Sequence, residues 1–366
     1  MSPTRSQRAG SAHSSHPRPS WGSAQGCITG RSSSATFASR PFPGAFPVVP
    51  RPGNSVAPQH QHHPGSPHEH DGGDRAARGH GVHGGVAMSA RLRGIAQQTE
   101  QVVTAGYYRA SDGREVSVAA AVAEAREGTR MYGPEPVEPP RYTPARTVFE
   151  VTGESSLEAA RRLGGEVAVL NFASARNPGG GYLNGAQAQE EALCRASALY
   201  TCLLRAREFY DHHRAHRDPF YTDRVIHSPA VPVFRDDRGH LLDEPYTAGF
   251  LTAAAPNAGV VLRTAPERAV ELPAALAARA ERVLETATVH GYRRLVLGAW
   301  GCGVFRNDPA QVAGAFRTLL GPGGRFSAAF ERVTFGILDR TPGGTVRQAF
   351  ACAFPEGAGR PAQAQP

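Results

Sequence analysis

The hydrophobic pattern divides the chain into four segments. Residues 1–87 are rich in Ser, Pro, Gly and His and lack apolar periodicity, so they are predicted to form a disordered tail. Over 88–145 apolar residues first recur at helical spacing, which predicts a helical lead-in subdomain that ends in a Pro-rich linker. The segment 146–355 alternates strand-like and helix-like patterns, and 356–366 is again predicted to be disordered.

The alternation in 146–355 predicts an α/β fold. Short apolar, β-branched runs predict strands, and longer amphipathic runs predict helices. The predicted strands are Thr147–Val151, Val167–Phe172, Arg224–Val233, Gly259–Arg263, Arg294–Leu297 and Arg332–Leu338. The predicted helices are Ser155–Leu163, Ala188–His212, Pro273–His290 and Pro309–Leu320. This order favours an α/β sandwich with a largely buried central sheet.

The N-terminal segment allows two further interpretations. Met88 opens the stretch in which helical patterning first appears, which favours Met88 as the natural start and a mis-assigned reading frame before it. The intact mass of the endogenous protein tests this prediction. The histidines between His60 and His70 offer ligands for a transition metal, but without fixed ligand spacing a soluble tail is favoured.

Composition narrows the classes of function. All 40 basic residues are arginines, because the chain contains no lysine, so lysine-dependent P-loop, protein-kinase and Schiff-base chemistries are excluded. The net charge is 40 − 32 = +8, of which residues 1–87 carry 8 − 3 = +5, leaving +3 on the remaining residues. This nearly neutral remainder argues against nucleic-acid binding, and no direct DNA binding is expected.

Cysteine usage and hydropathy bear on location and cofactors. The five cysteines are scattered and form no CxxC pair, which is typical of a reducing cytoplasm. No apolar run approaches the roughly 18–20 residues that a membrane span needs, so no membrane partner is expected. No metal-ligand set is apparent outside the tail, so metal independence is predicted and no cofactor is expected.

The strongest sign of chemistry lies in 167–200. A valine-rich strand leads into the triplet Gly179–Gly181, and seven residues later Gln189, Glu190 and Glu191 begin a helix. Three consecutive glycines cost backbone entropy unless positive φ or a close approach requires them. Between a strand and a helix, the usual ligand is a phosphate or a sugar held by backbone N–H groups.

The two adjacent glutamates cannot share one role. On a helix they point roughly 100° apart, so one is expected to face a ligand while the other braces it or meets solvent. The alternative is that both are first-turn glutamates that stabilise the helix dipole by some tenths of a kcal/mol. The preceding glycine loop favours the functional interpretation.

A second glycine-rich loop follows the strand Arg294–Leu297. Gly298, Gly301 and Gly303 are suited to hold phosphate, and Phe305 is suited to lie over a flat ring or a diphosphate. The sequence GCGVFR is not the dinucleotide fingerprint, because it has an arginine in place of the third glycine. Two such loops at one end of a sheet predict a single crevice for a phosphate-bearing nucleotide, with one or two glutamates inside.

Other residues carry weaker signals. His227 is expected to be a structural histidine rather than a base. Trp300 is suited either to stack on a base or to pack in the core. Cys194 and Cys302 flank the loops without an activating histidine in sequence and are expected to pack.

These motifs resemble a known enzyme family. The glycine triplet, seven residues and QEE resemble the signature of the poly(ADP-ribose) glycohydrolases. The flanks NFASARNPGGGYLNGAQAQEEAL and GAWGCGVFRNDP look like the microbial-type branch, with similarity expected over 88–355. The resemblance implies a macrodomain-like three-layer α/β/α sandwich with a mixed central sheet. It further implies poly(ADP-ribose) or ADP-ribosylated protein as partner, hydrolysis of the ribose–ribose O-glycosidic bond, and ADP-ribose as product.

The resemblance also assigns roles to residues. Glu191 matches the catalytic acid/base, and Glu190 matches the neighbour that helps to bind the ribose. Many macrodomains have Asn where this chain has Ser174, so Ser174 or Asn177 is expected to replace a ribose contact. The ADP-ribose-binding set implied in this way is Ser174, Asn177, Gly179, Gly180, Gly181, Gln189, Gly301, Gly303, Val304 and Phe305.

The expected chemistry is acid/base hydrolysis. Cleavage of a glycosidic bond passes through an oxocarbenium-like state and needs a protonated carboxyl beside the leaving oxygen, after which the same carboxylate activates water. The alternatives are a non-catalytic ADP-ribose reader, a mono-ADP-ribosyl hydrolase and an Arg-rich nucleic-acid-binding protein. The intact QEE favours an enzyme over a reader.

Overall fold

The structure, a computed structural model, describes residues 80–355, with side chains from residue 87 onward. Most of the predicted tail, including its histidine cluster, and the segment 356–366 lie outside the described residues. Helix α1 (His80–Ala105) begins upstream of Met88, where the sequence pattern predicts the helix to start. Translation from Met88 stays a prediction.

The core of the fold is a mixed seven-stranded sheet. In chain order the strands are β1 (Tyr107–Arg109), β2 (Glu115–Ser117), β3 (Arg130–Tyr132), β4 (Val148–Thr152), β5 (Val167–Phe172), β6 (Val225–Arg235), β7 (Leu241–Ala253), β8 (Arg294–Leu297) and β9 (Arg332–Gly336). The large sheet has the order β3-β6-β7-β5-β8-β9-β4, and β1 pairs with β2 separately. From β7 to β4 the strands are parallel, whereas β6 and β3 are antiparallel to their neighbours. The sheet confirms the predicted α/β fold.

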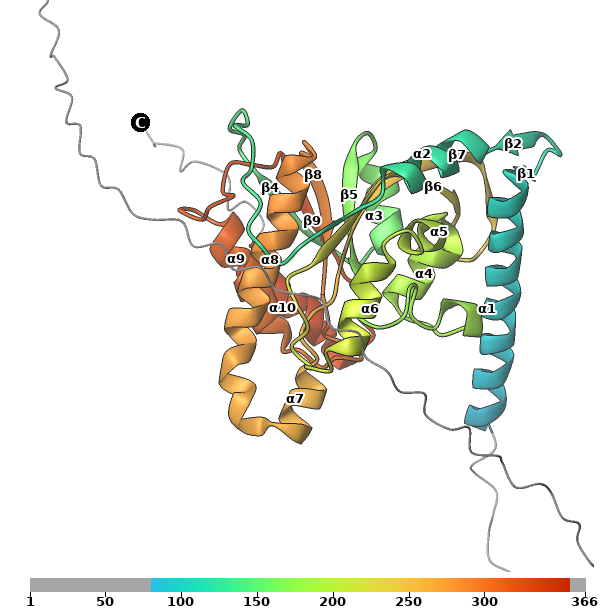
Figure 1. Cartoon of the computed structure of the whole chain (residues 1–366). Coiled ribbons are helices and arrows are strands. Elements are labelled where there is room, and N and C mark those ends of the chain that lie inside the picture. The colour runs from blue at the N-terminus through green and yellow to red at the C-terminus, as the bar shows by residue number, and fades with distance from the viewer. Residues whose placement is uncertain (1–79, 356–366) are drawn as a thin grey trace, which may run out of the picture. The chain divides into compact units, whose positions relative to one another are not determined.

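Helices cover both faces of this sheet (Figure 1). They are α2 (Ala119–Gly128), α3 (Ser156–Leu163), α4 (Gln189–Ala196), α5 (Leu199–Leu203), α6 (Arg207–Ala215), α7 (Ala258–Thr264), α8 (Leu272–Val289), α9 (Pro309–Leu320) and α10 (Thr345–Ala353). Short 3-10 turns are η1 (Tyr182–Asn184), η2 (Pro266–Glu271) and η3 (Pro342–Gly344). Within residues 80–355, no helix combines the length and apolar character that a bilayer span requires.

Two apolar cores lie on opposite faces of the sheet. Val167 and Val169 of β5 pack in the core formed with α1 to α6. Ala168 and Leu170 pack in the core formed with α8, α9 and α10. Because both faces of β5 are buried, the strand reads as an almost unbroken apolar run, which is why its bounds could be predicted.

Two predicted elements are wrong. The predicted strand Gly259–Arg263 is helix α7, because the Asn257 side chain accepts from Val260 N–H and so caps a helix start. The predicted continuous helix Ala188–His212 is three helices. Ser197 breaks it, since its backbone is extended, its hydroxyl bonds Leu193 and it forms a bridge with Val233 of β6.

Several elements were missed: β3, β7, the β1–β2 hairpin and helix α10. The apolar pattern of β7 is interrupted by Asp243, Glu244, Pro245 and Gly249, which hide the strand, yet β7 pairs with both β5 and β6. The β1–β2 hairpin lies inside the segment predicted as a helical lead-in. Helix α10 packs Phe350 into the core beside β9.

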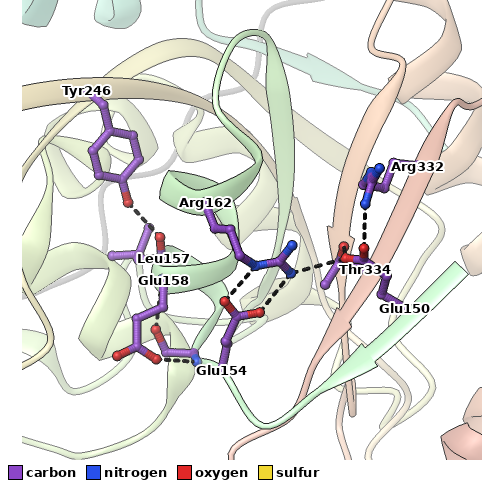
Figure 2. A network of polar contacts seen from close by, with 9 residues as sticks. Glu150, Glu154, Leu157, Glu158, Arg162, Tyr246, Arg332 and Thr334 are labelled. Atoms are coloured by element: carbon purple, nitrogen blue, oxygen red, sulfur yellow. Dashed lines mark hydrogen bonds and ion pairs between the residues drawn. The ribbon is translucent and has the colours of Figure 1, made fainter. Parts of the chain in front are cut away.

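Helix α3 is fastened to the edge of the sheet by ion pairs (Figure 2). Arg162 of α3 lies 2.7 Å from Glu154 and 3.1 Å from Glu150 of β4. Glu150 also pairs with Arg332 of β9 and accepts a hydrogen bond from Thr334 at 3.0 Å. These contacts hold α3 across β4 and β9, so that its first turn faces the N-terminus of α4.

Candidate active site

The two glycine-rich loops leave the same edge of the sheet. β5 ends at Phe172 and β8 at Leu297, and the two strands are parallel neighbours, so the segments after them begin side by side. The two segments are also close to each other where they start, because a Cβ on Gly298 would lie 3.0 Å from the Phe172 ring. The structure thus places both loops at one end of one sheet, as the sequence predicts.

The first loop passes directly over two carboxyls of α4. Gly179 and Gly180 have φ of +66° and +57°, a region that side chains rarely adopt. A Cβ on Gly180 would clash with Glu191 Oε1 and would lie 3.1 Å from Glu190 Oε2. Both requirements for a glycine, positive φ and close approach, are therefore met at Gly180.

Glu191 has one oriented and one unpartnered carboxyl oxygen. Its side chain is buried at the start of α4, with 8% of the residue exposed. Gly181 N–H donates to Oε1 at 2.9 Å, whereas Oε2 is buried and has no hydrogen-bond partner. A buried acceptor without a partner is costly, so Oε2 is a candidate for contact with substrate or water.

Glu190 is the more deeply buried member of the pair, at 3% exposure. Ser174 N–H donates to its Oε2 at 2.7 Å, and Asn171 Nδ2 lies 3.4 Å from its Oε1. Burial raises the pKa of Glu190 to about 8, with the Glu191 charge adding to the rise and the Ser174 N–H opposing it. Two buried carboxyls do not fit the alternative of solvated first-turn glutamates.

Asn171 is a site residue that sequence reasoning missed. It is fully buried on β5, on the face that packs against α4, and its Nδ2 donates to Thr252 of β7 at 3.1 Å. Its Oδ1 is buried without a partner. The signal was present, because an asparagine inside an otherwise apolar strand needs a polar reason to be there.

Ser174 and Asn177 shape the first loop. Ser174 supports Glu190 through its backbone N–H, and its hydroxyl accepts from Asn177 N–H at 3.3 Å. The Asn177 carbonyl accepts from Gly180 N–H at 2.9 Å, which tightens the turn, and its side chain is exposed. A ribose contact by either side chain stays a prediction.

Gln189 connects α4 to the sheet and to α3. Its Oε1 accepts from Phe172 N–H at 2.9 Å. Its Nε2 donates to Leu170 carbonyl at 2.8 Å and to Ser156 Oγ at 3.1 Å. Both ends of the amide are thus engaged by the fold, and direct binding of ADP-ribose by Gln189 stays a prediction.

The second loop is shaped by a buried asparagine. Gly301 has φ of +72°, and a Cβ there would lie 2.5 Å from Asn307 Nδ2. That nitrogen donates to the carbonyls of Pro256 at 2.8 Å and Gly301 at 3.2 Å, which connects the loop to the end of β7. Asn307 was not singled out from the sequence, although the helix Pro309–Leu320 was predicted right after it and is capped by Asp308.

The tip of the second loop is open to solvent. Gly303 is exposed and Val304 is 81% exposed. Phe305 is half-buried, with its ring centroid 5.8 Å from that of Tyr221. The three residues predicted to bind ligand here therefore lie at an accessible edge, and their contacts with ADP-ribose stay predictions.

The weaker candidates lie in the interior. Trp300 is 1% exposed and donates from Nε1 to Ala253 carbonyl at 3.0 Å, which favours packing over base stacking. His227 is buried, lies 3.0 Å from Tyr292 OH and stacks on His290, as a structural histidine does. Cys194 is fully buried beneath Gly179, where a Cβ would lie 3.3 Å from its sulfur.

Comparison with known proteins identifies the family. A family model described as "Microbial-type PARG, catalytic domain", where PARG is poly(ADP-ribose) glycohydrolase, matches residues 96–236. The glycohydrolase of Thermomonospora curvata, in a crystal structure with the inhibitor ADP-HPD, is 48% identical with a TM-score of 0.66. That match covers 72% of this chain and 100% of the other. The chain belongs to the microbial-type poly(ADP-ribose) glycohydrolase family.

A second member of this glycohydrolase family gives the same result. The Deinococcus radiodurans glycohydrolase in complex with ADP-ribose is 44% identical with a TM-score of 0.60, and covers 66% of this chain and 99% of its own. No curated protein matches the chain. Membership confirms the family resemblance that the GGG and QEE motifs predicted.

Proposed function

We propose that Glu191 is the acid and base with which this glycohydrolase cleaves the ribose–ribose O-glycosidic bond of poly(ADP-ribose). One observation carries the proposal. Gly181 N–H holds Oε1 at 2.9 Å, whereas Oε2 is buried without a protein partner. One oxygen is thus oriented by the protein and the other is free to transfer a proton.

The reaction follows from this arrangement. Protonated Glu191 gives its proton to the leaving ribose oxygen as the C–O bond breaks, which leaves an oxocarbenium-like ribose and a carboxylate. The carboxylate then takes a proton from water while the water oxygen bonds to the anomeric carbon, so Glu191 is protonated again. ADP-ribose and a shortened polymer are the products.

Glu190 contributes through its burial and its place beside Glu191. Burial raises the pKa of Glu190 to about 8, so this carboxyl, next to Glu191, keeps its proton near neutral pH. Glu190 is fixed by Ser174 N–H and is placed beside Glu191 to orient the ribose hydroxyls. Neither step needs a metal ion, so turnover is expected to persist in EDTA.

The two glycine loops are proposed to bind the diphosphate and the ribose. The glycines bring backbone close to the carboxyls without side chains in between, and N–H groups at such turns favour anions. The complex of the Deinococcus radiodurans relative with ADP-ribose supports this ligand. The proposed contacts are made by Ser174, Asn177, Gly179, Gly180, Gly181, Gly301, Gly303, Val304 and Phe305.

Substitution of the acid tests the proposal. Glu191→Gln keeps the shape and the contact with Gly181 N–H but cannot exchange the proton, so release of ADP-ribose should fall by about 1,000-fold or more. Calorimetric titration with ADP-ribose should give a dissociation constant within about threefold of wild type.

Glu208→Gln is the matched control, because Glu208 also lies in the first turn of a helix, α6, but is exposed. This variant should keep wild-type turnover. Turnover retained in Glu191→Gln refutes the assigned role, and lost ADP-ribose binding in it points to a collapsed site.

The proposal also covers the preferred substrate, polymer or single ADP-ribose, and the compartment in which the enzyme acts. Polymer is favoured over mono-ADP-ribosylated protein by family membership, and release of ADP-ribose from each substrate under identical conditions separates the two. A reader would bind ADP-ribose without turnover of either. A macrodomain-type fold is supported by the mixed sheet with an apolar core on each face. A cytoplasmic location is supported by the cysteines of the described residues, all of which are free, and cell fractionation tests it.

A further inference from the structure

We propose that helix α1 is part of the catalytic scaffold, and that the Tyr182 hydroxyl positions the Gly181 N–H that orients Glu191. The inference rests on the proposed role of Glu191. It assigns a function to the N-terminal helix, which contributes no residue to the pocket predicted from the sequence.

Tyr182 follows Gly181 directly in the first loop. Its ring is 1% exposed and packs 5.2 Å from the Tyr200 ring, centroid to centroid. Its hydroxyl lies 2.9 Å from Glu100 Oε1 and 3.1 Å from Ala96 carbonyl, both on α1. A hydroxyl has one proton to donate, and a charged carboxylate is the stronger acceptor, so Glu100 is the main anchor.

The other end of η1 also contacts α1. Gly185 has φ of +74°, and a Cβ there would clash with Ser89 carbonyl and lie 3.0 Å from Arg93 Cγ. Ser89 Oγ donates to Asn184 carbonyl at 3.3 Å. Helix α1 therefore meets the loop both immediately after Gly181 and at its exit, so the loop cannot shift without α1.

A third contact joins α1 to the helix that carries the glutamates. Thr99 Oγ1 donates to Arg195 carbonyl near the end of α4 at 2.7 Å. Arg195 in turn donates to Ala186 carbonyl at 2.7 Å, just before α4 begins. The loop that supplies Gly181 N–H and the helix that supplies Glu191 are thus both held against one rigid element.

The consequence concerns the orientation of Glu191. Displacement of a catalytic group by about 1 Å can lower a rate by about 100-fold, because proton transfer depends steeply on geometry. Loss of the Tyr182 hydroxyl leaves the ring in place but frees the loop to tilt on α1. The effect is therefore expected on kcat more than on KM.

Tyr182→Phe tests the inference. Its kcat for ADP-ribose release should fall by about tenfold, with KM changed by less than about threefold. Tyr108→Phe is the matched control, since Tyr108 is also a buried tyrosine whose hydroxyl bonds a backbone carbonyl, that of Leu242, at 2.7 Å. The Tyr108→Phe variant should lose about as much stability as Tyr182→Phe and keep the wild-type kcat.

Substitutions of Glu100 separate positioning from stability. Glu100→Gln keeps an acceptor for the hydroxyl and should keep kcat within about threefold of wild type, whereas Glu100→Ala should lower it further. In the Tyr182→Phe background, Glu100→Ala should have no additional effect on kcat, because its influence passes through the hydroxyl. Melting temperatures of all variants show that the enzyme is folded.

Two results overturn the inference: a kcat of Tyr182→Phe equal to that of Tyr108→Phe, or an equal effect of Glu100→Ala on kcat in both backgrounds. Failure of the proposed function looks different. It appears as full turnover in Glu191→Gln, whatever Tyr182→Phe does.

Discussion

At the scale of single residues, burial distinguishes Glu190 and Glu191 from ordinary solvated glutamates at a helix start, which the local sequence alone does not. Glu190 and Glu191 follow each other at a helix start, as solvated dipole-stabilising glutamates often do. The QEE motif predicted their importance, but only the fold brings Gly180 over both carboxyls and Asn171 beneath Glu190. Asn171 was missed because its contact with Glu190, 19 positions away, is made by the fold and belongs to neither motif.

Gly180→Ala is expected to damage catalysis more than stability. The new methyl group would have to displace Glu191 Oε1, and φ of +57° adds strain of about 1–3 kcal/mol. We expect kcat for ADP-ribose release to fall by about 100-fold. Gly113→Ala is the control, because Gly113 has φ of +83° and no atom within 4 Å of its Cβ position, so only the strain remains. Equal kcat in both variants would show that Gly180 merely satisfies backbone geometry.

His227 should make stability depend on pH. Burial and the nearby His290 lower its pKa to about 3, whereas a histidine in the unfolded chain titrates near 6.5. The unfolded state therefore binds an extra proton between these values, so this contribution is complete above about pH 6.5 and is lost as the pH falls towards 3. Within that window, each unit by which the pH falls should lower the free energy of unfolding by about 1.4 kcal/mol through His227.

Urea unfolding between pH 7 and pH 5 measures this slope. His227→Gln should flatten it by about one proton. An unaltered slope in His227→Gln would mean that other groups account for the acid sensitivity.

At the scale of elements, prediction succeeded where local and tertiary preferences agree. β5, β8 and α9 have the predicted bounds, because each is a continuous apolar run or is marked by a cap such as Asp308. Prediction failed where tertiary contacts determine the secondary structure. Ser197 interrupts a favourable helical pattern to pair with β6, and Gly259–Arg263 is too short for its apolar run to distinguish strand from helix.

Substitution of Gln189 tests whether this first residue of α4 holds the helix against the sheet. Gln189→Ala would leave Phe172 N–H and Leu170 carbonyl without their partner, which should lower the free energy of unfolding by about 1–3 kcal/mol. Affinity for ADP-ribose should change by less than about threefold if the residue only positions α4. Gln187→Ala, at an exposed site two residues earlier, should change neither quantity. A large loss of affinity at unchanged stability would instead support direct binding by Gln189.

At the scale of the whole molecule, the site is assembled from segments far apart in the sequence. The glutamates come from α4, their donors from the loop after β5, the second loop from the strand beside it, and the support from α1. Because β5 and β8 are parallel neighbours between two apolar cores, both loops start from a rigid edge. The two glycine-rich loops, each following a predicted strand, predicted this meeting, but the sequence could not predict that the N-terminal helix supports one of them.

A chain that begins at Met88 is expected to keep wild-type kcat within about twofold. The contacts that join α1 to the catalytic loop and to α4 come from Ser89, Ala96, Thr99 and Glu100, all of which such a chain retains. A chain that begins at Gly106 lacks them and also exposes the core that α1 covers, so it should lose turnover and melt at a lower temperature. Steady-state release of ADP-ribose and thermal melting of the three chains measure both effects. Lost activity in the chain from Met88 would show that residues before it contribute to the enzyme.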